Sequence, residues 1–390
     1  MKELYVTDAV RYIGVDDKTI DLFESQYHVP NGVSYNSYVI LDEKVAVMDT
    51  VDRRATEAWL ANLEEALDGR TPDYLVVHHM EPDHAANIQT LAEKYPHMQI
   101  VGNCKTFAMM ERFFTFDLAE RKVEVKEGST LSLGSHTLTF VMAPMVHWPE
   151  VMVSYESSEK ILFSADGFGK FGALDAEEPW EDEARRYYLN IVGKYGAQVQ
   201  ALLKKAAGLD IAMICPLHGP VLKENLGYYI GLYDKWSRYE PEIDGVFIAF
   251  ASIHGNTAKA ARLLGEKLEQ RGIKVKVADL SRADMAQCVS DAFQYSRMVC
   301  AAASYDGGLF PPMEDFLHHL RSKTYRCRTV ALVENGTWAP SAGRCMRELF
   351  CQMKDIRLRE ETVLIPSTVK PETEAQLEQL ADWLTENEKA

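Results

Sequence analysis

Short apolar runs that end in polar or charged residues recur along the first part of the chain. Their length and their β-branched or aromatic content predict buried strands at residues 36–41, 45–48, 74–77, 99–101, 123–125, 137–142, 161–165 and 211–215. Longer stretches between them predict helices at residues 56–66, 88–94 and 180–205. Residues 1 to about 240 therefore mix strands with helices.

A second pattern begins after a short charged linker at residues 238–245, which contains proline and glycine. Strands are predicted at residues 246–250, 298–303 and 329–333, and helices at residues 258–270 and 372–385. Alternation of strand and helix implies a parallel sheet with helices on both faces. A chain of 390 residues suits two domains, which we place at residues 1–240 and 246–390.

The segment His79-Met80-Glu81-Pro82-Asp83-His84 carries two imidazoles and two carboxylates directly after a predicted strand. Buried polar groups are costly unless they are paired or bound to a metal. Pro82 favours extended geometry before it, and in an extended segment His79, Glu81 and Asp83 point one way. The segment therefore predicts half of a two-metal site.

Three further residues follow predicted strands in the same manner: His147, Asp166 and His218. Alone, each has an ordinary interpretation as a satisfied polar residue or a turn. Together with the six-residue segment, their repeated placement at strand ends indicates one shared site.

This arrangement resembles the metallo-β-lactamase superfamily, with Glu81 where its zinc hydrolases carry a histidine. A glutamate there, with the other ligands kept, is typical of the flavodiiron proteins. The resemblance implies an α/β chain, with a metallo-β-lactamase-like αββα sandwich followed by a flavodoxin-like doubly wound domain. It also implies two non-heme irons, one held by His79, Glu81 and His147 and one by Asp83, His84 and His218, with Asp166 as the bridge.

Three loops after predicted strands of the second half resemble the flavin mononucleotide (FMN) loops of flavodoxins and flavodiiron proteins. The first loop, at residues 252–257, combines hydroxyls, a glycine and the start of a helix, which suits the binding of a phosphate. A plain helix cap explains Asn256 and Thr257 nearly as well. Tyr305 and Trp338 are candidates to flank the flavin ring or are ordinary loop aromatics. His254 departs from the usual residues of both families. The candidate FMN residues are Ser252, Ile253, His254, Gly255, Asn256, Thr257, Ser304, Tyr305, Asp306, Gly307, Gly308, Asn335, Gly336, Thr337 and Trp338.

The formal net charge of −16 disfavours a nucleic-acid partner, since phosphate binding needs clustered lysine and arginine. We expect no membrane span, because no run of about 18 apolar residues is present, and the start of the chain lacks a signal-peptide core. Seven cysteines without a C-x-x-C pair favour a reduced, cytoplasmic protein.

The resemblance implies reduction of oxygen to water, of nitric oxide to nitrous oxide, or of both, with electrons passing through FMN. It implies a head-to-tail homodimer, alone or as a dimer of dimers, and an external electron donor. Rubredoxin is the default donor and a deazaflavin its rival. Tyr195 is either the tyrosine that the family often places in the pocket of the diiron site or an ordinary core or surface residue. A zinc hydrolase with an attached flavodoxin domain and a diiron oxygen sensor remain the alternatives.

Overall fold

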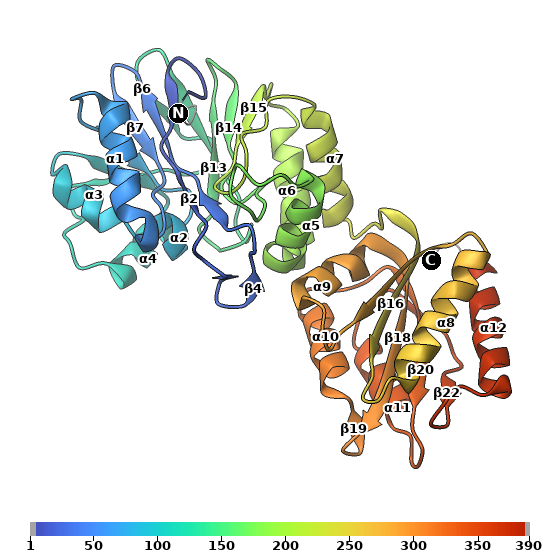
Figure 1. Cartoon of the computed structure of the whole chain (residues 1–390). Helices are drawn as coiled ribbons and strands as arrows, with labels where there is room; N and C mark the ends of the chain where they lie inside the picture. The colour runs from blue at the N-terminus through green and yellow to red at the C-terminus, as the bar shows by residue number, and fades with distance from the viewer. Residues whose placement is uncertain (1–4, 387–390) are drawn as a thin grey trace. The chain divides into compact units, whose positions relative to one another are not determined.

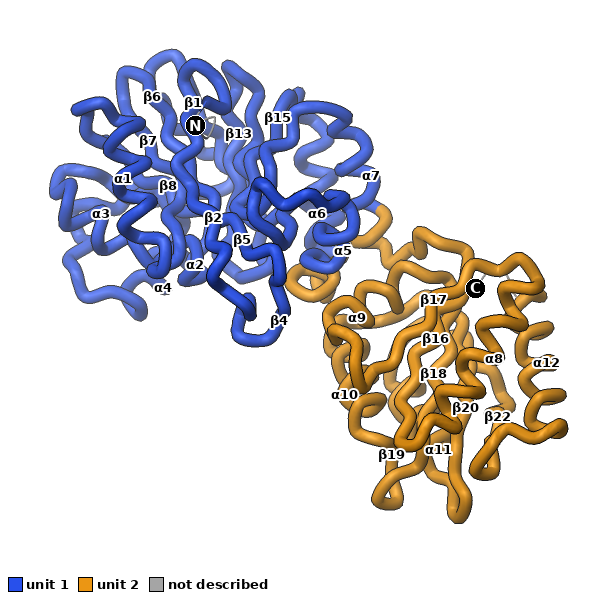
Figure 2. The backbone as a smooth tube through the Cα atoms, in the orientation of Figure 1, with its two compact units in different colours: residues 1–188, 197–234 blue, residues 189–196, 235–390 orange. Residues whose placement is uncertain are grey.

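The computed structural model describes residues 5–386, which divide into two compact units (Figures 1 and 2). Unit 1 comprises residues 1–188 and 197–234, and unit 2 comprises residues 189–196 and 235–390. The described part of the chain contains no helix with the length and apolar character needed to cross a membrane.

Two sheets lie face to face in unit 1. The first has the order β1 (Val10–Tyr12), β6 (Tyr38–Leu41), β7 (Val45–Met48), β8 (Tyr74–Val76), β9 (Gln99–Gly102), β10 (Lys122–Glu124). The second has the order β11 (Thr130–Ser132), β12 (Thr137–Met142), β13 (Met152–Glu156), β14 (Ile161–Phe163), β15 (Met213–Cys215). Apolar side chains from both sheets, such as Met48, Val76, Phe140 and Phe163, form one buried cluster between them.

Helices cover the outer faces of this sandwich (Figure 1). Beside the first sheet lie α1 (Thr56–Leu67), α3 (Ile88–Lys94) and α4 (Cys104–Phe113), and beside the second lie α5 (Trp180–Ile191), α6 (Gly196–Ala206) and α7 (Leu226–Ser237). The remaining elements are short: the paired strands β2 (Val15–Asp17) and β5 (Val33–Tyr35), the paired strands β3 (Leu22–Phe23) and β4 (Tyr27–His28), and η1 (Arg53–Ala55), α2 (Pro82–Ala85) and η2 (Gly193–Tyr195).

The strand directions of the second sheet bring three loops to one edge of the sandwich. Strand β13 runs antiparallel to both β12 and β14, and β14 runs parallel to β15. The C-terminal ends of β12, β14 and β15 therefore lie at the same edge. The residues that follow these three strands are available to a single site.

Unit 2 is a doubly wound sheet of the order β17 (Lys274–Asp279), β16 (Ile243–Ala251), β18 (Tyr295–Tyr305), β20 (Arg328–Asn335), β21 (Ile356–Leu358), with β22 (Val363–Ile365) also on β20 and the short β19 (Gly308–Leu309) on β18. Every pairing except β18 with β19 is parallel. Helices α8 (Asn256–Gln270) and α12 (Pro371–Glu386) pack on one face in one buried cluster. Helices α9 (Met285–Gln294), α10 (Pro311–Ser322) and α11 (Ala342–Phe350) complete the unit (Figure 1).

Two local expectations were wrong. The continuous helix predicted at residues 180–205 is broken into α5, η2 and α6. The break coincides with Gly193 and Gly196, and a Cβ on Gly196 would collide with the Ser237 carbonyl oxygen. The extended geometry predicted through Asp83 ends at Glu81, because Pro82 occupies the first position of α2, where its fixed φ suits a helix.

Candidate metal centre and flavin pocket

Seven predicted residues form two neighbouring groups with ligand atoms close enough to share a metal. His79, Glu81, His147 and Asp166 form the first group, and Asp83, His84 and His218 form the second. Within each group the ligand atoms lie within 4.8 Å of one another. These groups come from the β8–α2 connection, α2 itself, and the loops after β12, β14 and β15.

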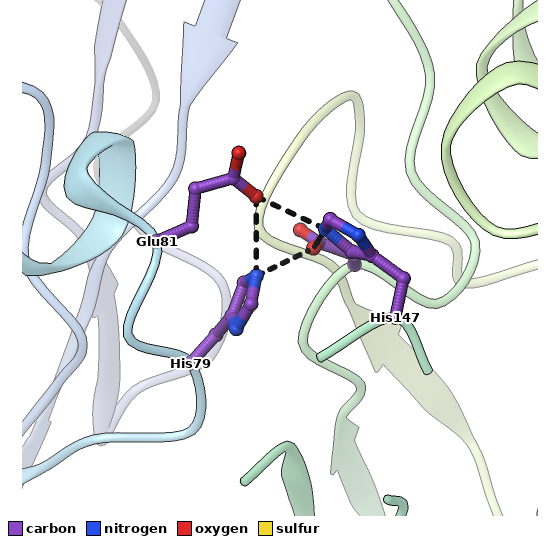
Figure 3. A group of neighbouring side chains, drawn as sticks. His79, Glu81 and His147 are labelled. Atoms are coloured by element: carbon purple, nitrogen blue, oxygen red, sulfur yellow. Dashed lines mark hydrogen bonds and ion pairs between the residues drawn. The ribbon is translucent and has the colours of Figure 1, made fainter. Parts of the chain in front are cut away.

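The first group is arranged around two carboxylate oxygens. Glu81 Oε2 lies 3.2 Å from His79 Nε2 and 3.0 Å from His147 Nε2. Asp166 Oδ2 lies 3.3 Å and 3.2 Å from the same two nitrogens. Figure 3 shows His79, Glu81 and His147 converging on one point from different parts of the chain.

The second group meets the first through Asp166. Asp83 Oδ2 lies 3.3 Å from His84 Nε2 and 3.2 Å from His218 Nε2. Asp166 Oδ1 lies 3.4 Å from His84 Nε2, whereas its Oδ2 faces the first group. One carboxylate therefore presents one oxygen to each group, which is the arrangement a bridging ligand requires. The helical turn of α2 directs Asp83 and His84 to this second group.

The donor atoms fit a pair of metal ions. Both oxygens of Asp83 and of Asp166 are buried without a hydrogen-bond partner among the described residues. Buried carboxylates in that situation are costly unless a cation balances them. The set of imidazole and carboxylate ligands suits iron or another first-row metal.

Charge within the groups shifts the pKa values strongly. Burial raises the pKa of Asp83 to about 7, with His84 opposing the rise and the Glu81 and Asp166 carboxylates adding to it. Burial lowers the pKa of His147, yet Asp166 and Glu81 outweigh it and raise that pKa to about 9. Burial keeps the pKa of His218 below its usual value. The groups therefore hold protons that a bound metal would displace.

Residues outside the two groups orient the histidines by contacting their Nδ1 atoms. His79 Nδ1 lies 2.8 Å from Glu150 Oε1, and His218 Nδ1 lies 2.7 Å from the Ser34 carbonyl oxygen. His78, which the metal assignment leaves out, is buried between Asp49 Oδ2 at 2.5 Å and Ser154 Oγ at 2.8 Å. A histidine held in this way has its tautomer and ring orientation fixed.

Three residues near the groups escaped prediction from the sequence. Glu150 follows His147 by three positions, which is a usable signal, since an acidic residue so close is a candidate outer partner. Glu24, between β3 and β4, lies beside Glu81 with its side chain partly exposed, and partial burial and the charge of Glu81 raise its pKa to about 7. Tyr187 is fully buried with its ring centroid 5.5 Å from that of His218, but its sequence position resembles any core tyrosine of a helix.

Tyr195 is not placed with Tyr187. It is half-buried in η2, within the segment 189–196 that belongs to unit 2, and the Lys194 ammonium lies 5.9 Å from its ring centroid. Tyr187 and Tyr35, both of unit 1, are tyrosines with ring contacts to the candidate ligand His218. The break between α5 and α6 separates Tyr187 from Tyr195, and the sequence pattern did not reveal it.

Unit 2 contains a cavity of about 550 Å³ at the C-terminal ends of β16, β18, β20 and β22. All the predicted flavin residues line it except Gly255 and Gly308. The lining also includes four residues that were not among the candidate FMN residues, namely Ala303, Ala339, Ser341 and Ser367. Ligands of doubly wound sheets bind at this edge, where the connections after two neighbouring strands turn to opposite faces of the sheet.

The two ends of this pocket differ in chemistry. Gly255 adopts a left-handed φ of +89° as it turns the chain into α8, and its N–H donates to Ser252 Oγ at 3.1 Å. The start of this helix supplies backbone donors for an anion. Trp338 is 81% exposed and Tyr305 44% exposed, so each has a free aromatic face at the rim. Ser304 Oγ instead accepts from Ser341 N, so that hydroxyl supports the loop itself.

Comparison with known proteins identifies the family. The model of the ODP family beta lactamase matches residues 33–219. The structure of rubredoxin oxygen:oxidoreductase from Desulfovibrio gigas superposes with a TM-score of 0.92 and 26% identity, covering 98% of both chains. The chain belongs to the flavodiiron protein family. This match across both units confirms the recognition and the fold class predicted from the sequence.

Relatives within the flavodiiron proteins differ in length. The nitric oxide reductase of Moorella thermoacetica is 29% identical over 331 residues, which are 82% of each chain. Diflavin flavoprotein A 2 of Synechocystis is 31% identical over 301 residues, covering 73% of this chain but 50% of that protein. The chain therefore spans about half the length of this relative.

Proposed function

We propose that this flavodiiron protein is an oxidoreductase that reduces oxygen to water, nitric oxide to nitrous oxide, or both. The observation that carries the proposal is Asp166, whose two oxygens face two separate groups of histidines and carboxylates. Relatives named nitric oxide reductase and rubredoxin-oxygen oxidoreductase support the two gases as substrates.

We assign the two metals as non-heme irons and the flavin as FMN. His79, Glu81 and His147 would hold one iron, Asp83, His84 and His218 the other, and Asp166 both. When bound, the irons supply the electrons and open positions for a multi-electron reduction, and the flavin supplies electrons one at a time. Glu81 favours iron over zinc, because a carboxylate in place of an imidazole makes the donor set harder.

The chain's own residues prepare this site in two ways. Buried rings exclude water on one side, since Phe23 and Tyr187 lie with centroids 5.4 Å and 5.5 Å from that of His218. The Glu24 carboxyl lies beside Glu81, and partial burial together with the charge of Glu81 raises its pKa to about 7. A gas reduction that consumes protons benefits from such a neighbouring acid.

The electron donor and the assembly complete the proposal. We propose an external donor, with rubredoxin first and a deazaflavin second, and a head-to-tail homodimer. The exposed Trp338 and Tyr305 at the rim of the flavin pocket support a surface that meets another protein. We also propose a reducing compartment, the cytoplasm, since all seven cysteines are free thiols. Light scattering coupled to size exclusion measures the assembly, with a monomer contradicting the dimer.

The test combines composition with single turnover. Purified protein reconstituted with iron and FMN is expected to hold about two irons and one flavin per chain. After anaerobic reduction it is mixed with oxygen or with nitric oxide, and flavin reoxidation and nitrous oxide are followed. Reoxidation by neither gas would overturn the proposed function. Zinc content with ester hydrolysis would favour the hydrolase, and binding without turnover would favour the sensor.

A further inference from the structure

The two metal positions differ in what lies behind their histidines. His79 Nδ1 faces the carboxylate of Glu150 at 2.8 Å, and both side chains are 0% exposed. His218 Nδ1 faces a neutral backbone carbonyl, that of Ser34. His84 Nδ1 is buried with no hydrogen-bond partner among the described residues. Only the first of these three imidazoles is backed by a negative charge.

Glu150 is itself fixed in place by the backbone. Its Oε1 accepts from Met80 N at 2.9 Å, and its carbonyl oxygen accepts from Asn103 Nδ2 at 2.6 Å. Asn103 is the N-cap of α4, with its side chain accepting from Lys105 N and Thr106 N. The carboxylate is therefore held by His79 and by the next backbone N–H, and the backbone of Glu150 is held by the residue that caps α4.

This geometry fixes the tautomer of His79. Glu150 Oε1 requires a proton on Nδ1, so Nε2, which faces Glu81 and Asp166, is the nitrogen left for a metal ion. An imidazole that donates to a carboxylate is a more basic ligand than one that donates to a carbonyl. Glu150 Oε2 has no hydrogen-bond partner among the described residues, so His79 is the one side chain shown to neutralise this buried carboxylate.

We propose that Glu150 is a positioning residue that makes the His79 group the tighter of the two metal positions. The inference rests on the proposed metal centre and deepens it, by making the two ions unequal. Metal loading then proceeds in two separable steps. The first ion enters the group of His79, Glu81, His147 and Asp166, and the second enters the group of Asp83, His84 and His218.

The test titrates metal-free, FMN-containing protein with Zn²⁺ under anaerobic conditions by calorimetry. The unsubstituted protein is expected to show a tight step and a weaker step. E150Q removes the charge and keeps the size, and should weaken the tight step about 10- to 100-fold, as loss of an outer partner typically does. The weaker step should move less than about threefold. A single step of equal sites, or equal weakening of both steps, would overturn the inference.

The matched control is E156Q. Glu156 is also 0% exposed in unit 1, but it accepts from the backbone N–H groups of Ser158 and Glu159 instead of a histidine. Its substitution should leave both binding steps unchanged. Weakening of the tight step by E156Q to the same extent as by E150Q would overturn the inference, since a general loss of structure would then explain both.

A spectroscopic readout keeps the inference falsifiable if E150Q fails to fold. In the Zn²⁺-loaded unsubstituted protein, the His79 Nδ1–H proton should appear in ¹H–¹⁵N spectra, shifted far downfield by the carboxylate. A deprotonated His79 Nδ1 would overturn the inference. Because these tests measure metal binding and not gas reduction, protein that binds two ions in two steps but reduces neither gas would overturn only the proposed function.

Discussion

The Nε2 atoms of His84 and His218 face each other at 3.1 Å. His218 presents a lone pair there, because its Nδ1 donates to the Ser34 carbonyl and burial keeps its pKa low. At this distance the two imidazoles share one Nε2 proton in a hydrogen bond. The Asp83 and Asp166 carboxylates also surround the pair, so a metal ion that displaced this proton would meet two imidazole nitrogens and two carboxylates.

Removal of the Glu81 side chain should separate the two cofactors. E81A takes away the oxygen that lies between His79 Nε2 and His147 Nε2, so we expect metal affinity of the first group to fall more than about 100-fold. The flavin spectrum should persist, because the flavin pocket belongs to unit 2. Iron and flavin analysis after reconstitution measures both effects. The exposed Glu57 of α1 offers the control E57A, which should retain both cofactors. Loss of flavin in E81A would contradict the assignment of the sites to separate units.

Removal of the Trp338 ring should act on the flavin alone. The ring is 81% exposed at the rim of the flavin pocket, so W338A leaves no cavity in the core. Loss of a stacking partner worth about 1 kcal/mol should weaken FMN binding several-fold and shift the flavin absorbance and potential. Fluorescence titration with FMN and a redox titration measure these changes. Y228A, at an exposed tyrosine outside the pocket, should change neither. Unchanged affinity, spectrum and potential in W338A would remove Trp338 from the flavin site.

The metal-free protein should lose stability as the pH rises from 6.5 to 9. The pKa of His147 is raised from 6.5 to about 9 in the folded state, so its stabilisation is complete below pH 6.5 and is lost as the pH passes 9. The loss is on the order of 3 kcal/mol, since one pKa unit corresponds to about 1.4 kcal/mol. The pKa of Asp83, raised to about 7, changes stability with the same sign over lower pH values. Urea unfolding of chelator-treated protein across this range measures the slope.

Metal-loaded protein serves as the control and should lack the decline, because the metal replaces the protons. Stability that rises over this interval would contradict the protonation pattern.

The seven candidate metal residues come together in the structure, and most of them follow an apolar run that becomes a strand. His147, Asp166 and His218 converge because β12, β14 and β15 end at one edge, and apolar runs alone reveal strands but not their order. The placement of Asp83 depended on whether the chain stays extended past Pro82, and a proline permits both an extended residue before it and a helix after it. Ser367 in the flavin pocket was missed because β22 has three residues, too few for a periodic pattern.

The core of unit 2 offers a prediction on stability. Arg328 is fully buried, and its guanidinium donates to the carbonyl oxygens of Tyr239, Phe293 and Tyr295. R328M keeps much of the volume but leaves these buried acceptors without their donor, at a cost of about 1–3 kcal/mol for each unsatisfied group. We expect the free energy of unfolding of unit 2 to fall by about 3 kcal/mol or more. Urea titration with FMN fluorescence as the probe measures this change. Arg344 of α11 is exposed and pairs with Glu348 at 3.0 Å, and surface pairs contribute at most about 1 kcal/mol. R344M therefore serves as the control, and equal costs for the two substitutions would show that the carbonyls around Arg328 find other donors.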